Sequence, residues 1–185
     1  AQPQRIELAS HDALWPSVSR DGGRLAYGRS ILQADLWKWE TGRKPAPFLS
    51  STARDTFPQL SADGLHIAFQ SARGGEMDIW AARTDGTGLV QITKNHGTSN
   101  GSPRWSPDGR WLVAGGGGEA AVLWDLSLPK PAAKPIHLMG RSGFVQITGD
   151  GKLLIDSTDE RSIRVWNLEG IAQHAESYFK FGIFG

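Results

Sequence analysis

The stretch Ser102–Gly116, SPRWSPDGRWLVAGG, places a tryptophan-bearing strand, an Asp-Gly turn and an apolar strand directly one after another. The same pattern recurs as WPSVSRDGGRLAYG, FPQLSADGLHIAFQ and FVQITGDGKLLIDS. The Asp-Gly pairs begin at residues 21, 63, 108 and 150, so the steps between them are 42, 45 and 42 residues. A fixed period of this size is the signature of a repeat protein. The stretch is therefore one repeat of a unit that occurs four times.

Each repeat has the residue types of a small antiparallel sheet. An Asp-Gly pair between apolar runs tolerates the positive φ of a tight turn, so it joins a first strand to a second. The second strands, RLAYG, HIAFQ, WLVAG and LLIDS, are almost continuously apolar, which predicts burial on both faces of the sheet. A weaker fourth strand follows in APFLSS, LVQITK and PIHLMG. Each third strand carries a large residue that we interpret as an anchor between units, namely Trp37, Trp80, Trp124 and Trp166.

Four strands in a unit of ~43 residues, with both faces covered by neighbouring units, predict a β-propeller blade. We therefore expect an all-β fold, a β-propeller of four-stranded antiparallel blades, with four blades encoded in this chain. The fourth repeat ends after its third strand, and residues 5–10 match an outer strand, so this N-terminal strand is expected to close the last blade. The expected propeller spans residues 1–170, with blade repeats at about 11–54, 55–100, 101–142 and 143–170.

The segment 171–185, IAQHAESYFKFGIFG, matches no part of a blade and is interpreted as an aromatic C-terminal tail. Its first half has helical spacing and its last residues alternate as in a strand, so the pattern leaves its conformation open. An exposed aromatic cluster is unfavourable in water. We therefore expect the tail to dock on the ring, on a second copy of the chain or on a partner.

The second repeat, FPQLSADGLHIAFQSARGGEMDIWAARTDGTGLVQIT (57–93), resembles the TolB-like propeller repeat throughout. The third and fourth repeats lack the acidic residue before the tryptophan, and RVWNLEG in the fourth is more similar to a WD repeat. The resemblance covers roughly residues 5–168 and implies a fold more than a function. Families of this kind usually build rings of six to eight blades. Four blades would then close alone, share a ring with a second chain as a homodimer, or belong to a longer protein.

Composition restricts the possible functions. Twenty Lys and Arg against nineteen Asp and Glu leave a net charge of +1, so charge favours neither nucleic acid nor an anionic membrane as a partner. The absence of cysteine excludes disulfides and thiolate chemistry. No apolar run reaches the ~18 residues that a membrane span needs. The compartment stays open, because a periplasmic or secreted location follows if a signal peptide preceded Ala1, and a cytoplasmic one otherwise.

The sequence offers no catalytic motif, and we expect no enzymatic activity, no metal and no cofactor. There is no Gly-x-Ser-x-Gly elbow, and the five histidines do not form the His-Glu-x-x-His pattern of a metalloprotease. AGGGGEAA (114–121) lacks the Gly-Lys-Ser or Gly-Lys-Thr ending of a phosphate loop, so it is interpreted as a flexible hairpin. The repeated aspartates stand on separate blades and are interpreted as turn formers: Asp21, Asp63, Asp108 and Asp150.

Function is expected on the face formed by the loops that lead into first strands and by the hairpins between second and third strands. The candidate partner-binding residues there are His11, Asp12, Arg54, Asp55, Arg73, Asn100 and Arg141. Their arginines would suit the capture of a carboxylate or a backbone carbonyl from a peptide. Ordinary solvated loop charges are the alternative interpretation. The spacing of Arg73 and Asp78 also allows a cross-strand ion pair, which we interpret as structural.

The leading functional hypothesis is a non-enzymatic protein-interaction module that binds a peptide or protein through its loop face. One alternative is a regulatory or substrate-gating propeller module of a hydrolase whose catalytic domain is elsewhere. Another is a structural propeller fragment or an engineered ring with no ligand. A catalytic motif in the full gene would favour the second hypothesis, and nearly identical repeats would favour design, but the four repeats differ widely.

Overall fold

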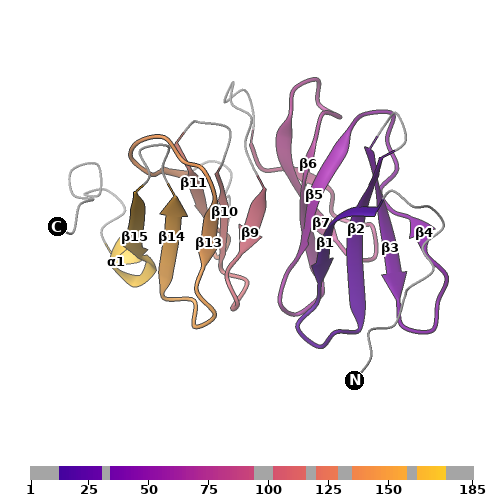
Figure 1. Ribbon diagram of the computed structural model, residues 1–185, viewed down its shortest axis with the longest axis horizontal. Coiled ribbons are helices and arrows are strands. Elements are labelled where there is room, and N and C mark those ends of the chain that lie inside the picture. The colour runs from indigo at the N-terminus through magenta and orange to yellow at the C-terminus, as the bar shows by residue number, and fades with distance from the viewer. Residues whose placement is uncertain are drawn as a thin grey trace.

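The structure is a computed structural model, and it describes residues 13–30, 34–93, 102–115, 120–128, 135–157 and 162–173. These residues form three four-stranded sheets and one three-stranded sheet, in the order of the sequence (Figure 1). All strand pairs are antiparallel between consecutive strands. The predicted all-β propeller of four blades is confirmed. The expected closing strand at residues 5–10 and most of the tail lie outside the described residues.

The strands divide into four blades along the chain. The first blade contains β1 (Ala13–Val18), β2 (Arg24–Ser30), β3 (Ala34–Glu40) and β4 (Ala46–Pro47). The second contains β5 (Asp55–Leu60), β6 (His66–Ser71), β7 (Asp78–Arg83) and β8 (Val90–Gln91). The third contains β9 (Pro103–Trp105), β10 (Trp111–Ala114), β11 (Val122–Asp125) and β12 (Ile136–His137). The fourth contains β13 (Val145–Ile147), β14 (Leu153–Ser157) and β15 (Ile163–Asn167).

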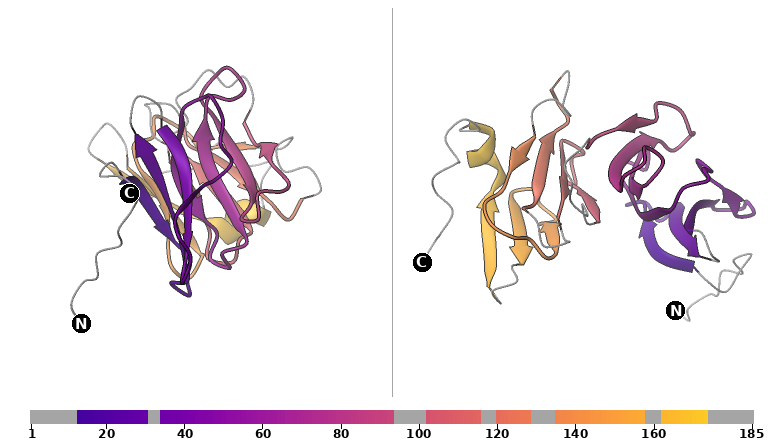
Figure 2. Two further views of the ribbon diagram at one scale, coloured as in Figure 1. Left: turned by 90° about the vertical axis from the view of Figure 1, so that its right-hand side faces the viewer. Right: turned by 90° about the horizontal axis from the view of Figure 1, so that it is seen from above.

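Neighbouring blades meet at their first strands, with β1 beside β5, β5 beside β9, and β9 beside β13. Figure 1 shows β13, β9, β5 and β1 across the middle of the view, with β15 and β4 towards its two sides. The view from above in Figure 2 shows the first and fourth blades at opposite ends of the row. We call the surface formed by β1, β5, β9 and β13 the central wall.

Alternation along the second strand explains why it is apolar on both sides. In β10, Trp111 and Val113 face the fourth blade and pack in one cluster with Trp166. Leu112 and Ala114 point the other way and pack against the second blade. All four residues of β10 are between 0% and 4% exposed. The predicted burial on both faces is therefore confirmed for this strand, because each neighbouring blade packs against one of the two faces.

The tryptophans of the third strands all point in the same direction along the row. Trp80, Trp124 and Trp166 each pack in the cluster that their blade shares with the preceding blade. Trp124 and Trp166 are 1% and 4% exposed, whereas Trp80 is half-buried. Trp37 alternates with Leu36, which faces the second blade, so Trp37 lies on the opposite face of its sheet. Three of the four predicted anchors are thus contacts between blades.

The turn between first and second strands is built identically in every blade. A hydroxyl donates to the aspartate two residues later at 2.5 or 2.6 Å, in the pairs Ser19–Asp21, Ser61–Asp63, Ser106–Asp108 and Thr148–Asp150. The same hydroxyl accepts a backbone N–H from the start of the second strand. The glycine after each aspartate has a φ between 67° and 73°, which favours glycine because it lacks a Cβ. The interpretation of the aspartates as turn formers is confirmed.

A short helix, α1 (Leu168–Gln173), follows β15. The side chain of Asn167 caps it, because Asn167 Oδ1 accepts the backbone N–H groups of Glu169 and Gly170 at 3.0 and 3.2 Å. Leu168 and Ile171 are buried in the cluster between the third and fourth blades. The first residue of the predicted tail, Ile171, therefore belongs to the core between these two blades.

Candidate functional site

The structure places the predicted loop residues on two blades. Arg54 is exposed just before β5, and Asp55 begins β5 fully buried. Arg73 lies in the hairpin between β6 and β7, so these three residues share the second blade. Arg141 is exposed in the connection that leads into β13 of the fourth blade. Three further candidates lie outside the described residues: His11, Asp12 and Asn100.

Arg73 holds the connection between the first and second blades. Its Nη2 donates to Asp55 Oδ2 at 3.0 Å and to the backbone carbonyl of Leu49 at 3.0 Å. Its Nε donates to Ser71 Oγ at 2.9 Å, and the guanidinium lies 4.9 Å from the centroid of the Phe69 ring. The side chains of Arg73 and Asp55 are only 12% and 0% exposed. In this arrangement the two residues bind each other and the loop.

The predicted ion pair between Arg73 and Asp78 is wrong. Asp78 instead accepts a hydrogen bond from Thr93 Oγ1 at 2.6 Å, which ties β7 to the end of its blade. The register explains the difference, because Ser71 lies opposite Asp78 on one side and opposite Asp55 on the other. Arg73 reaches past Ser71 to the carboxylate of Asp55, whereas Asp78 is already satisfied within its own blade.

The fourth blade contains a similar Arg–Asp ion pair, formed by different residues. Arg164 Nε donates to Asp156 Oδ2 at 3.0 Å, and its Nη2 donates to the backbone carbonyl of Arg141 at 2.7 Å. Its Nη1 donates to the backbone carbonyl of Met139. Ser142 Oγ donates to the other carboxylate oxygen of Asp156 at 2.6 Å. A buried ion pair thus anchors the connection from the third blade, and Arg141 contributes its backbone to it.

A polar position on the first strands was missed by the sequence reasoning. Two residues before each turn hydroxyl, the four repeats carry Ser17, Gln59, Arg104 and Gln146, which we call the polar row. Ser17 Oγ accepts the backbone N–H of Leu60 at 2.7 Å, and Gln59 Oε1 accepts from Arg104 Nη1 at 3.3 Å. The row therefore joins β1 to β5 and β5 to β9 across the central wall. The signal in the sequence is a polar residue that recurs at one place between larger apolar ones.

Arg104 is half-buried, and no carboxylate of the described residues forms an ion pair with it. Within the described part of the chain, its Nη1 donates to two uncharged oxygens, Gln59 Oε1 at 3.3 Å and the backbone carbonyl of Pro103 at 3.0 Å. Burial lowers the pKa of the guanidinium from its ordinary value, because removal of water disfavours the charged form. Arginine nevertheless stays protonated at neutral pH. Arg104 therefore carries a charge that the described residues leave uncompensated.

Two aromatic residues flank the polar row where β1 meets β5. Trp15 and Phe57 occupy equivalent positions in their repeats, and their ring centroids lie 4.7 Å apart. Both have a positive φ, 52° and 50°, at an irregularity in the strand register. Bulky residues adopt this conformation only when the surroundings impose it, and such positions cluster at functional sites. Gly28 makes room for Trp15, since a Cβ there would lie 2.6 Å from the indole ring.

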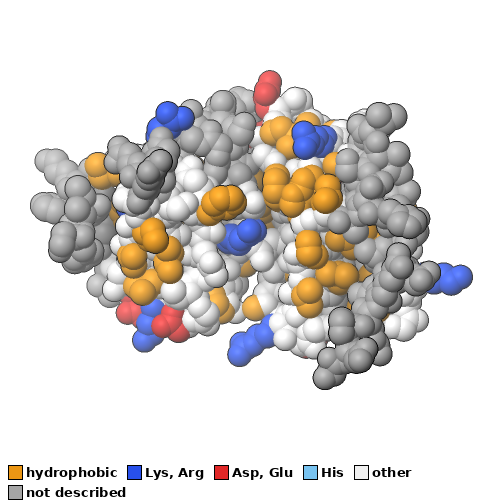
Figure 3. Space-filling view, in the orientation of Figure 1, with side chains coloured by type: hydrophobic (Ala, Val, Ile, Leu, Met, Phe, Trp, Pro, Cys, Tyr) orange, Lys and Arg blue, Asp and Glu red, His pale blue; other side chains and the backbone are white. Residues whose placement is uncertain are grey.

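The surface view agrees with this picture of the central wall. Figure 3, in the orientation of Figure 1, shows a basic side chain near the middle of the wall with hydrophobic side chains on both sides of it. A surface of this kind can bind an extended segment that carries an anionic group between apolar side chains. Arginine is the side chain best suited to the anionic group, because its planar fork matches a carboxylate.

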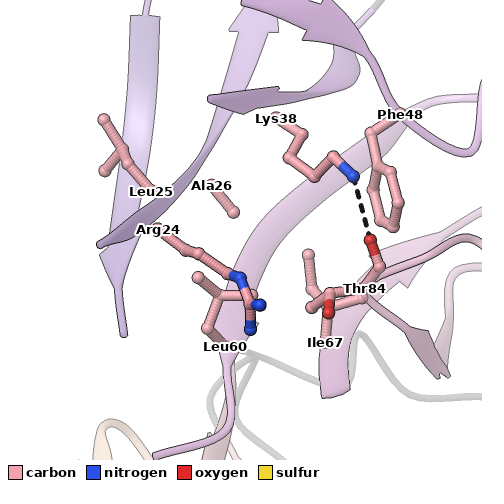
Figure 4. A pocket seen from close by; sticks show the side chains of 8 residues that line it. All are labelled: Arg24, Leu25, Ala26, Lys38, Phe48, Leu60, Ile67 and Thr84. Carbon is pink, nitrogen blue, oxygen red and sulfur yellow. Dashed lines mark hydrogen bonds between the residues drawn. The ribbon is translucent and has the colours of Figure 1, made fainter. Parts of the chain in front are cut away.

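The gap between the first two blades is too small for a ligand. Its volume is about 10 Å³, which is room for roughly one water molecule. Figure 4 shows Arg24 and Lys38 reaching across it towards the second blade, with the apolar side chains of Ala26 and Leu60 beside them. Lys38 Nζ donates to the backbone carbonyl of Thr84 at 3.1 Å. This gap is therefore part of the packed interface between the two blades.

A wider groove, of about 430 Å³, lies at the outer side of the first two blades. Its lining mixes both signs of charge, with Arg43 and Lys44 beside Glu40 and Asp85. Arg43 already pairs with Glu40 at 3.4 Å. Arg43 and Lys44 are exposed, so water solvates their charges, whereas Arg104 is half-buried.

The described part of the chain contains no group of three His, Cys, Asp or Glu side chains arranged to hold a metal ion. Its one helix, α1, is far shorter than a membrane-crossing helix.

Four blades that meet at their first strands define the class of the molecule as a β-propeller. Its fold is that of the TolB-like propellers. TolB from Acinetobacter baumannii superposes with a TM-score of 0.66 at 16% identity, covering 88% of this chain and 43% of that one. A putative TolB from Agrobacterium tumefaciens gives 0.52 at 20% identity, covering 89% and 48%. A chain of the nidogen/laminin complex gives 0.65 at 14% identity, covering 90% and 62%.

Two curated proteins are similar over part of the chain. The uncharacterized peptidase YuxL of Bacillus subtilis (strain 168) is 31% identical over 108 residues, covering 53% of this chain and 16% of that protein. The WD repeat-containing protein 26 homolog of Arabidopsis thaliana is 28% identical over 126 residues, covering 65% and 20%. The chain thus spans a fifth or less of the length of these relatives. No family model matches it.

Proposed function

We propose that the chain is a non-enzymatic propeller module that binds a segment of a protein or peptide on its central wall, with Arg104 as the anchor for a carboxylate. The observation that carries the proposal is the half-buried charge of Arg104, which has no carboxylate partner among the described residues. A buried charge is costly unless it is paired. A bound carboxylate would supply the missing partner, while Trp15 and Phe57 would pack against its apolar neighbours. The exposed loop residues Arg54 and Arg141 would then contact flanking parts of the same segment.

The test uses fluorescein-labelled seven-residue peptides with a central Glu between aromatic or aliphatic residues, and the same peptides with Gln. We expect anisotropy titrations to show tighter binding of the Glu peptides. Arg104→Gln should lower their affinity at least ~10-fold, because a hydrogen bond to a charged group contributes about 1.5–3 kcal/mol. The matched control is Arg20→Gln, an exposed arginine, which should bind as the unaltered chain does.

Three results would contradict the proposal. One is the absence of binding by every peptide up to millimolar concentration. Another is equal affinity for Glu and Gln peptides. The last is an Arg104→Gln variant that remains folded by circular dichroism and binds with unchanged affinity.

A second candidate function is a substrate-gating propeller module of a hydrolase, and the similarity to the peptidase YuxL favours it. In that case a catalytic domain with a Gly-x-Ser-x-Gly elbow is encoded beside this segment in the gene. The check is the flanking coding sequence, followed by labelling of the full-length protein with a fluorophosphonate probe. Labelling supports the hydrolase, and a complete gene without such a domain excludes a catalytic domain on the same chain.

A further inference from the structure

Two ion pairs inside the blades use the same edge of an arginine side chain. The Nε and Nη2 atoms lie on one edge of the planar guanidinium, so together they can donate to a single carboxylate. Arg110 presents this edge to Asp125, with Nε 3.2 Å and Nη2 2.7 Å from Oδ2. Arg164 presents the same edge to Oδ2 of Asp156. In both pairs a carboxylate of the chain occupies the Nε–Nη2 edge.

Arg104 leaves its Nε–Nη2 edge open. Its Nη1 forms the hydrogen bonds, to Gln59 Oε1 at 3.3 Å and to the backbone carbonyl of Pro103 at 3.0 Å. Nε and Nη2 have no partner among the described residues, and neither nitrogen is completely shielded from water. The edge that holds a carboxylate in Arg110 and Arg164 is therefore accessible in Arg104.

Gln59 determines where this edge points. Its Oε1 accepts from Arg104 Nη1, and its backbone carbonyl accepts the indole N–H of Trp105 at 3.1 Å, so it contacts two successive residues of β9. Because the guanidinium is a rigid plane, a hydrogen bond on Nη1 also restricts the direction of Nε and Nη2. The amide of Gln59 carries no charge, whereas a glutamate of the same length would neutralise the arginine. Residue 59 thus decides whether the charge is balanced inside the chain.

We propose that Gln59 is the positioning residue that makes the central wall selective for a carboxylate, which binds side-on to Nε and Nη2 of Arg104. This inference rests on the proposed function, because it concerns the same site. The pair Arg110–Asp125 provides the template for the geometry within the same fold. A carboxylate fits this edge because its two oxygens match the two N–H groups. The preference for an anion over an amide follows from the neutrality of Gln59.

The first test needs no ligand. Gln59→Glu keeps the length of the side chain and adds one negative charge beside Arg104. By NMR titration, the introduced carboxyl group should have a pKa at least about 1 below the ordinary value of about 4.3, because the guanidinium favours its charged form. The reduction should disappear when Arg104→Gln is added. Leu89→Glu is the matched control, since Leu89 is exposed beside the outer strand of the same blade and its replacement should titrate normally.

The second test measures anion binding with two probes. Acetate, added at constant ionic strength, should shift the NMR signal of the Arg104 Nε–H group in the unaltered chain and in Leu89→Glu, and leave it unchanged in Gln59→Glu. With the labelled seven-residue peptides, Gln59→Glu should lower the affinity for Glu peptides at least ~10-fold and abolish their advantage over Gln peptides. Gln59→Met, which loses the hydrogen bond to Nη1 and adds no charge, should weaken the binding of Glu peptides by a smaller factor.

The outcomes separate this inference from the proposed function. An ordinary pKa for the introduced carboxyl group overturns the inference, as does a Gln59→Glu variant that still prefers Glu peptides or still responds to acetate. Unchanged affinity in Gln59→Met contradicts the positioning role. If no peptide binds the unaltered chain, but Gln59→Glu abolishes a response of Arg104 to acetate, peptide binding fails and the selective anion site stands. An Arg104 signal that ignores acetate and every peptide overturns both.

Discussion

Arg73 and Arg104 are both arginines shielded from water in the same fold, yet their environments are opposite. Arg73 pairs with the fully buried Asp55, a neighbouring hydroxyl and a backbone carbonyl. Arg104 reaches only uncharged oxygens and faces no carboxylate among the described residues. A carboxylate of the same chain balances the charge of Arg73, whereas the charge of Arg104 has no carboxylate partner among the described residues. Burial alone therefore does not assign a role to an arginine, and the proposed binding role of Arg104 rests on its lack of a carboxylate partner among the described residues.

The largest expected effect comes from breaking the completed pair. Arg73→Met leaves Asp55 buried without its cation, so we expect the free energy of unfolding to fall by about 3–5 kcal/mol. Urea titration followed by tryptophan fluorescence at pH 7 measures it. Arg54→Met, one position before Asp55 but exposed, is the control and should change stability by less than about 0.5 kcal/mol. A loss below about 1 kcal/mol for Arg73→Met would show that the pair does not hold the loop.

A smaller effect is expected at the arginine without a partner. Arg104→Met removes a desolvated charge and keeps the apolar stem, so the free energy of unfolding should stay within about 1 kcal/mol of the unaltered chain. The same urea titration applies. A loss as large as that of Arg73→Met would mean that Arg104 is compensated within the fold, and its assignment to binding would fail.

The smallest effect concerns a carboxylate held only by a turn. The hydrogen bond that Ser61 Oγ donates lowers the pKa of Asp63. The hydrogen bond from the backbone N–H of Leu65 lowers this pKa further. A lowered folded pKa stabilises the fold above the unfolded value of about 3.9, and this contribution is lost as the pH falls through the folded value. In an NMR titration Asp63 should titrate below the ordinary range, and Ser61→Ala should raise its pKa. An unchanged pKa in that variant would contradict the role of the hydroxyl.

The repeat predicted the strands because their signals are local. An Asp-Gly pair after a serine or threonine, followed by an apolar run, marks a turn and a second strand without reference to the rest of the chain. The faces of β10 were also predictable, since a strand that is apolar at every position must be covered twice. The same reasoning identified Trp124 and Trp166 as contacts between blades.

The site could not be predicted in the same way, because its charges pair across connections and blades. Asp55 and Asp78 are both within reach of the hairpin that carries Arg73, and only the register of β6 decides between them. The sequence around Arg104 gives no sign that its side chain lacks a carboxylate partner. That its charge lacks a carboxylate partner becomes clear only when the residues packed around β9 are known.

The constant direction of the third-strand tryptophans has a consequence for how such chains grow. In each of the three described junctions, the face that carries the third-strand tryptophan packs against the preceding blade, so these junctions are of one kind. Gene duplication within the row therefore lengthens the protein without creating a new kind of junction. The number of units, and not the chemistry of the junctions, then sets the size of the closed ring.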